Sequence, residues 1–239
     1  MEFGALLDDA FSYTKEGILC NISRWAALIL AVICLGIPMN GYAMRIYRGT
    51  DTAPDVDRWG TLFIDGIKLV IVGLVYSIPI LVVWAFIYGS MILTLGQGNL
   101  EAAGNFEPNL ALLLLMYAVE IAVGIIMPIA SIRFARTGSF GEAFNFGAIF
   151  GTIGKIGWIN YLLALIILTL VIGIPIFILM FGIIIVGGGG IYLVVGGGVE
   201  LLFAIAGLLI LAMLILSPII GVFQARYMTR VYESQEQAE

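Results

Sequence analysis

The chain has 239 residues, of which 62% are hydrophobic and only 11% are charged, and its formal net charge is −5. A soluble globular domain carries about 25% charged residues, so this composition excludes an ordinary soluble domain. The sequence has no histidine, and its two cysteines, Cys20 and Cys34, lack metal-ligand spacing. We therefore expect a polytopic α-helical membrane protein that is not an enzyme and holds no metal or cofactor. No basic stripe occurs, so we expect no nucleic-acid partner.

Five apolar segments are each long enough to cross a membrane, because about 20 helical residues at a rise of 1.5 Å span the hydrocarbon core. They are 25–44, 69–95, 110–132, 158–186 and 199–223. None has the alternating pattern of a barrel strand, and backbone polar groups in lipid must be bonded internally, so we predict helices. The spans occupy most of the chain, which predicts one integral membrane domain over 1–239.

The first span allows two interpretations. The segment 9–25 aligns without gaps with 142–158, which indicates a partial copy of a later unit at the N-terminus (9–48). If both segments lay at the same membrane face, the first span would be a re-entrant hairpin broken near Gly36 and Pro38, which is tolerated only where protein covers it. We favour a plain span, with the N-terminus outside the cell.

A proline followed by two arginines ends the first, third and fifth spans. These phrases begin at Pro38, Pro128 and Pro218. Lys and Arg concentrate in cytoplasmic loops, and five spans put nine of the eleven basic residues on one side, all except Lys15 and Arg24. We therefore predict a plasma-membrane protein whose C-terminus and basic loops are cytoplasmic.

One order of elements occurs twice. "LFIDGIK" (62–68) resembles "IFGTIGK" (149–155), and each segment precedes a span. The unit is an interfacial helix, two spans and the proline–arginine phrase. It predicts a parallel internal duplication, with copies at about 55–136 and 138–230.

The first predicted interfacial helix has an amphipathic pattern. Its apolar residues recur at helical spacing and are Trp59, Leu62, Phe63, Ile67 and Val70. We expect Trp59 and Phe63 to lie against lipid head groups or the bundle, and Asp57 and Thr61 to lie in water. The alternative is that this helix is only the start of a long tilted span.

The segment GYAMRIYRGTDTAPDVDRWGTLFIDGIKLVIVGLVYSIP (41–79) resembles the signature of a family of uncharacterised, mainly archaeal membrane proteins, domain of unknown function 4013. The matching residues are Gly41, Tyr42, Arg45, Pro54, Trp59, Asp65, Gly66, Lys68, Tyr76 and Pro79. The resemblance implies a helical membrane protein in an archaeal plasma membrane. It implies no activity, because the family has none established.

Glu120 lies midway along the third span, near the predicted bilayer centre. A charge there costs at least about 2.5–3.5 kcal/mol, and such acids usually face a bundle or a water-filled cavity. We expect a carboxyl that is protonated or closely paired with uncharged donors. The candidate donors are Tyr76, Ser77, Asn160, Tyr161 and Thr169. The residue either locks the bundle or binds a proton or cation on a pathway.

The segment "IVGGGGIYLVVGGGVELL" (185–202) is not a phosphate loop, because no Lys-Ser/Thr follows and the spacing is not G-x-G-x-x-G. We interpret it as an apolar hairpin between the last two spans. The alternative is an unwound segment that acts as a hinge or lines a cavity. Its candidate residues are Gly187, Gly188, Gly189, Gly190, Gly196, Gly197, Gly198 and Glu200.

Two functions remain. The favoured one is a non-catalytic membrane scaffold that organises lipid or a membrane-protein partner, including copies of itself. The alternative is a small permease or carrier that uses Glu120. A water-accessible cavity at Glu120 would favour the carrier, and a dry bundle would favour the scaffold.

Overall fold

The computed structural model describes residues 1–187, 189 and 198–235, and within these ranges its secondary structure is entirely helical. In chain order the elements are α1 (Phe3–Thr14), the π-helical segment η1 (Lys15–Leu19), α2 (Ile22–Ile33), α3 (Ile37–Tyr47), α4 (Trp59–Gly96), α5 (Leu100–Gly104), α6 (Leu110–Thr137), α7 (Phe140–Ala143), α8 (Phe146–Ile156), α9 (Trp158–Gly182), the π-helical segment η2 (Ile183–Gly187) and α11 (Val199–Glu233). The prediction of an all-α membrane-type bundle is confirmed.

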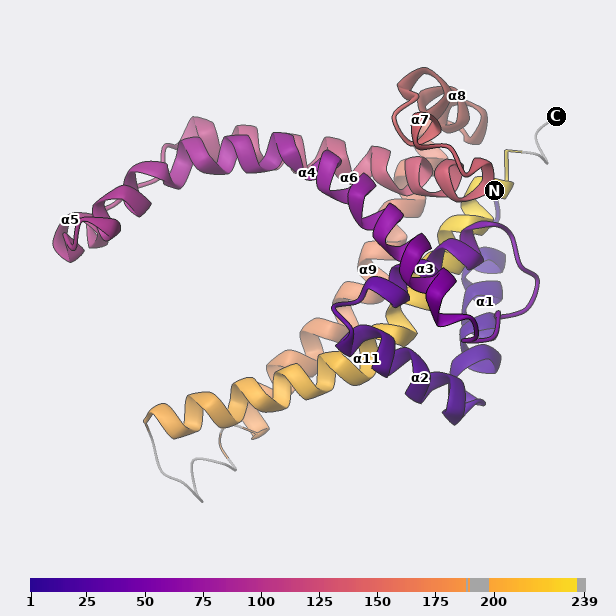
Figure 1. Ribbon diagram of the computed structural model, residues 1–239, viewed down its shortest axis with the longest axis horizontal. Helices are drawn as coiled ribbons and strands as arrows, with labels where there is room; N and C mark the ends of the chain where they lie inside the picture. Colours follow the sequence, from indigo (N-terminus) through magenta and orange to yellow (C-terminus); the bar gives the residue numbers. More distant parts are fainter. Residues whose placement is uncertain (188, 190–197, 236–239) are drawn as a thin grey trace.

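Two long helical arms leave a common base and splay apart (Figure 1). We call 1–75, 128–168 and 218–235 the base. The first arm (76–127) is the outer part of α4 and α6 with α5 at its tip. The second arm is the outer part of α9 and α11 (169–187 and 198–217). Pro128 and Pro218 stand where α6 and α11 enter the base, so these two proline–arginine phrases mark the boundary between arm and base.

Four of the predicted spans are confirmed in length and composition. They lie in α4, α6, α9 with η2, and α11. No residue is buried in the most apolar stretch of α6 or α11, and only 22% and 11% of the corresponding stretches in α4 and α9 are buried. The chain itself therefore buries few residues in the most apolar parts of the described arms. Each predicted repeat unit supplies one arm, while the internal duplication itself stays a prediction.

The preferred interpretation of the first span is wrong, because the segment is two short helices with a break between them. Leu35 and Gly36 have φ of 59° and 68°, a left-handed conformation that ends α2 before Pro38 starts α3. Arg24 at the start of α2 and Arg45 at the end of α3 both bind Asp55, at 2.7 Å each. The start of α2 and the end of α3 therefore lie close together on one side of the protein, as the re-entrant alternative requires.

Helix α1 lies beside α11, while the predicted orientation of the two termini across the membrane stays a prediction. Asp9 of α1 accepts hydrogen bonds from Arg226 at 2.6 and 3.1 Å and from Arg230 at 2.8 Å. Helix α1 thus packs along the inner end of α11. All eleven Lys and Arg residues belong to the base. The charged residues of the arms are all acidic.

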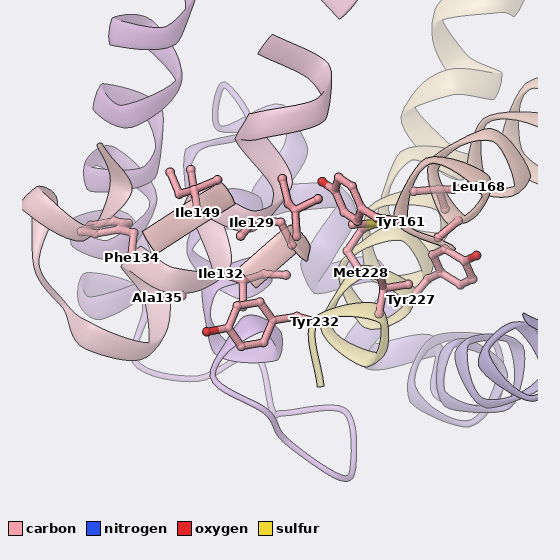
Figure 2. Close-up of a cluster of buried hydrophobic side chains, with 14 of the residues drawn as sticks. Ile129, Ile132, Phe134, Ala135, Ile149, Tyr161, Leu168, Tyr227, Met228 and Tyr232 are labelled. Carbon is pink, nitrogen blue, oxygen red and sulfur yellow. The ribbon is translucent and has the colours of Figure 1, made fainter. Parts of the chain in front are cut away.

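The core lies in the base, where the inner ends of the long helices meet. Side chains of α6, α8, α9 and α11 converge there (Figure 2). Ile129 and Ile132 of α6, Tyr161 of α9, and Tyr227 of α11 are fully buried. A second cluster joins α1, α2, α3 and α11 around Tyr42. Packing in these two clusters fixes the ends of the long helices that lie in the base.

The two predicted interfacial helices differ. Residues 59–68 are the first turns of the continuous helix α4, as in the alternative that they begin a long span. The second copy is a separate helix, α8, which ends at Gly157 with φ of 90°. Asp57 and Thr61 are exposed and Leu62 is buried, as expected, but Ile67 is 46% exposed. The buried stripe runs instead through positions 62, 66 and 69.

Candidate functional site: the arginine network and the grooves of the base

Helices α3 and α4 touch backbone to backbone through two glycines. A Cβ added at Gly41 would lie closer than 3.0 Å to the carbonyl oxygen of Leu62, and one added at Gly66 would lie equally close to that of Ile37. Tyr42, next to this contact, is fully buried and donates to the carbonyl oxygen of Pro54 at 2.8 Å. The contact requires glycine, because any side chain would push the helices apart.

Arg45 fixes the linker that starts α4. It donates to the backbone oxygens of Asp55 and Asp57 at 2.7 and 2.8 Å, to the Asp57 carboxylate at 2.6 Å and to Thr61 at 3.0 Å. The bond from Arg45 holds the pKa of Asp57 below its usual value. Charge-assisted bonds of this kind are short and specific, so Arg45 sets where α4 begins.

The remaining motif residues serve the same junction. Asp65 accepts a hydrogen bond from Arg48 at 2.7 Å and lies 3.9 Å from Lys68. Tyr76 donates to the carbonyl oxygen of Ala143 at 2.6 Å, which ties α4 to α7. Trp59 is the first residue of α4, and Pro79 lies inside it. Gly41, Tyr42, Arg45 and Gly66, described above, complete the set, so the motif builds the root of the first arm.

Arginines of α3 and α6 bind each other's helix ends reciprocally. Arg48 donates from Nε to the carbonyl oxygen of Ala135 at 3.2 Å, and Arg136 donates from Nε to that of Tyr47 at 3.1 Å. In both cases the acceptor directly precedes the other arginine. The last carbonyls of a helix lack intrahelical partners and carry the negative end of the dipole, so a guanidinium group suits them.

A chain of ion pairs closes the base around α1. Asp9 lies between Arg226 and Arg230, Arg230 reaches Glu233 at 3.1 Å, and Glu233 accepts from Arg136 at 2.5 Å. The Arg226 side chain is only 4% exposed and also donates to Thr50. Burial raises the pKa of Asp9, but the bonds from Arg230 and Arg226 outweigh it and hold that pKa below its ordinary value. Arginines of the second and third proline–arginine phrases therefore belong to one chain of ion pairs.

Every arginine in the described residues has a carboxylate partner. Besides the five discussed so far, Arg24 pairs with Asp55, Arg58 with Asp57 and Arg133 with Glu142. The network joins these eight arginines to six carboxylates, those of Asp9, Asp55, Asp57, Asp65, Glu142 and Glu233. Its work is to hold the base together.

Glu120 lies on the exposed face of the first arm, and none of the five described cavities includes it in its lining. The expected donors bind elsewhere. Tyr76, Ser77, Asn160, Tyr161 and Thr169 donate to the carbonyl oxygens of Ala143, Leu74, Ile156, Ile125 and Leu165 respectively. The predicted partners are therefore wrong, because these hydroxyl and amide donors bind backbone carbonyl oxygens instead.

The glycine-rich segment is described only at its edges. Gly188, Gly190, Gly196 and Gly197 lie outside the described residues. Gly187 ends η2, Gly189 is exposed, and Gly198 has φ of 121° immediately before α11. Glu200 is exposed in the first turn of α11, where the helix dipole favours an acid. None of these four residues lines a cavity described here.

The sequence analysis did not predict two apolar grooves. The first, which we call the α1 groove, has a volume of about 570 Å³ and lies between α1 with η1 and the roots of α9 and α11. The second, of about 590 Å³, lies between α6 and α9. The signal available in the sequence was the helical spacing of Ala10, Tyr13, Thr14, Gly17 and Ile18, all of which the structure buries. It marks 3–18 as a helix packed against the bundle.

A family model described as a protein of unknown function (DUF4013) matches residues 25–184. The match begins in α2, contains the α3–α4 junction and the first arm, and ends in η2. Comparisons with curated proteins and with solved structures returned no significant match. Because the family model covers more than half of the chain, and the motif residues of 41–79 lie within it, the chain belongs to the DUF4013 family of proteins of unknown function.

Proposed function

We propose that the protein is a non-catalytic membrane scaffold that organises lipid around its two arms. One observation carries the proposal. The most apolar stretches of the four candidate spans are almost unburied by the chain itself, while the base is cross-linked by ion pairs. A surface of this kind is covered in a membrane by lipid or by other membrane proteins, and the rigid base sets how far apart the two covered surfaces stand.

We also propose a plasma-membrane location with the base on the cytoplasmic side. All eleven basic residues belong to the base, whereas Glu101, Glu107, Glu120 and Glu200 are the charged residues of the arms. Lys and Arg collect on the cytoplasmic side of membrane proteins, and this bias sets their orientation. The four candidate spans of the arms are compatible with this, because both arms leave from one face and return to it.

The carrier alternative rests on Glu120 alone. Intramembrane acids on transport pathways face a bundle interior or a water-filled cavity. Glu120 instead lies on the exposed side of an arm, and the space between the arms is not enclosed (Figure 1). These features favour the scaffold.

The test compares lipid retention with ion flux. The purified protein is analysed by native mass spectrometry for bound lipid, and it is reconstituted into liposomes for proton-flux measurements. We expect retained lipid, flux no higher than that of protein-free vesicles, and unchanged behaviour for Glu120→Gln and Glu120→Leu. Flux well above the background that disappears in Glu120→Gln would replace the scaffold by the carrier.

A further inference from the structure

We propose that the α1 groove is a phospholipid site, in which an acyl chain fills the groove and the phosphate pairs with Lys15. The proposal rests on the proposed function, because it names the lipid that such a scaffold would hold at a fixed place. Two independent observations support it: the shape and position of the groove, and the charge at its rim.

The groove is apolar and of the size of a ligand pocket. Its walls are Phe11 and Leu19 on the N-terminal side, Val171 and Pro175 of α9, and Ile220 and Phe223 of α11. Its volume of about 570 Å³ falls within the range of about 300–1,000 Å³ that is usual for small-molecule sites. A methylene chain gains free energy from such a surface in proportion to the apolar area that it covers.

The groove lies where the second arm leaves the base. It contains residues on both sides of Pro218, namely Leu216 and Ile219, and it contains Pro175 of α9. Beyond it, the arm continues outward with exposed apolar side chains such as Phe177 and Leu211. An amphiphile with its head at the base would therefore place its chain along the arm, in the same direction as the surrounding lipid.

Lys15 stands at the rim with no partner. Among the described residues it is the one basic side chain without a recorded ionic or hydrogen-bonding interaction, since the arginines are paired, Lys68 contacts Asp65 and Lys155 has an interaction of its own. It is exposed. A lysine beside apolar membrane surface attracts lipid phosphate, with a gain of about 1 kcal/mol.

The other polar rim residues limit which head group fits. Asp8 and Ser12 line the rim with Lys15 and lie on the same helix face, seven and three residues before it. The Asp8 carboxylate repels a head group with several negative charges, and both side chains accept hydrogen bonds from a hydroxyl or amine. The geometry therefore points to a phospholipid with one phosphate.

The experiment is a titration of the delipidated full-length protein in detergent, followed by native mass spectrometry. The probes are a dioleoyl phospholipid with one phosphate and dioleoylglycerol, which has the same chains and no phosphate. We expect one phospholipid per protein to bind more tightly than dioleoylglycerol. Lys15→Gln should weaken phospholipid binding about fivefold, the equivalent of 1 kcal/mol, and leave dioleoylglycerol binding unchanged. Lys68→Gln, outside the groove, is the matched control.

A second pair of variants tests the groove itself. Val171→Trp places a large side chain inside it and should abolish binding of both probes, whereas Ile174→Trp, on an exposed face of the same helix, should have no effect. Equal affinity for the two probes, or binding unaffected by both Lys15→Gln and Val171→Trp, would overturn the site. A dimer that Val171→Trp dissociates would show that a second copy of the chain occupies the groove instead.

The outcome is separable from that of the proposed function. If the groove variants change nothing while the parent still retains lipid and shows no flux, this site is wrong and the scaffold stands. If the parent conducts protons, the scaffold is wrong, whatever the titration gives.

Discussion

At the scale of single residues, the contact between α3 and α4 depends on two glycines, which have no side chain. Gly41 and Gly66 let α3 and α4 approach until backbone meets backbone. We expect Gly41→Ala and Gly66→Ala each to lower the stability of the base by at least about 2–3 kcal/mol, because the obstructing atoms are carbonyl oxygens that cannot rotate away. Thermal unfolding in detergent, followed by fluorescence of the tryptophans, measures the loss.

The matched control lies on the same helix. Gly60 is in the first turns of α4, and an added Cβ there would meet nothing within 4 Å. Gly60→Ala should leave stability unchanged or raise it by about 0.5–1 kcal/mol, since alanine loses less backbone entropy than glycine. If all three alanine variants unfold at the same temperature as the parent, the close approach of α3 and α4 is wrong.

A second prediction concerns Asp9 and acid. The pKa of this carboxyl is lowered in the folded protein, so its contribution to stability is present above the unfolded value of about 4 and is lost as the pH falls through the folded value. We expect the melting temperature of the parent to fall below about pH 4, and Asp9→Asn to start lower and depend less on pH. The side-chain amide cannot replace a carboxylate between Arg226 and Arg230.

Asp51→Asn serves as the comparison for that experiment, because the Asp51 side chain is exposed and has no ion pair or hydrogen bond within the described part of the chain. Its pH profile should follow that of the parent. An Asp9→Asn profile that also follows the parent would show that the ion-pair chain adds nothing to stability in water, as is common for exposed pairs.

Sequence reasoning located the motif residues but assigned Glu120 the wrong surroundings. Gly41, Arg45 and Gly66 were identified by the family resemblance, and all three lie at the root of the first arm. The partners of Glu120 depend on how helices far apart in the chain face one another. Hydropathy gives the depth of a residue in the membrane and not the direction in which its neighbours splay.

At the scale of elements, the N-terminal third differs most from the predicted topology. A stretch of 20 apolar residues satisfies the length rule for a span whether or not it is broken. The break depends on Leu35, a non-glycine residue with positive φ, which no periodicity indicates. The bond from Arg24 to Asp55 joins residues 31 apart, and it could not be found from local patterns.

The hairpin of α2 and α3 predicts a labelling pattern. Single cysteines at Ser23, Asp51 and Ser139, in a chain without Cys20 and Cys34, should react alike with a membrane-impermeant thiol reagent, because all three belong to the base. Asn105, at the tip of the first arm, should show the opposite sidedness. We expect the first three to react only after the membrane is opened. If Ser23 reacted from outside while Asp51 did not, α2 and α3 would form a full span and the hairpin would be wrong.

At the scale of the whole molecule, the two arms and their shared base follow from where charge and apolar surface fall along the chain. The arms are long, apolar and nearly uncharged, so they solvate well in lipid and have little reason to pack against each other in preference to it. The base contains every Lys and Arg residue, and carboxylates and helix-end carbonyl oxygens hold its arginines. The sequence reasoning predicted five spans, of which four are confirmed in length and composition, and it missed the splay because that angle is set by packing at the roots.

The splay is directly measurable. Spin labels at Asn105 and Val199, at the tips of the two arms, should give a distance distribution in lipid nanodiscs much longer than the 8–10 Å between packed helix axes. A second pair at Asp51 and Ser139 in the base should give the same distance in detergent and in lipid. Because the base orients the arms through Asp9, Arg226 and Glu233, Arg226→Gln should broaden the distribution between the tips. A distribution that shortens to packed-helix distances in lipid would show that the arms close into one bundle, and the scaffold would then lose the open surface on which it rests.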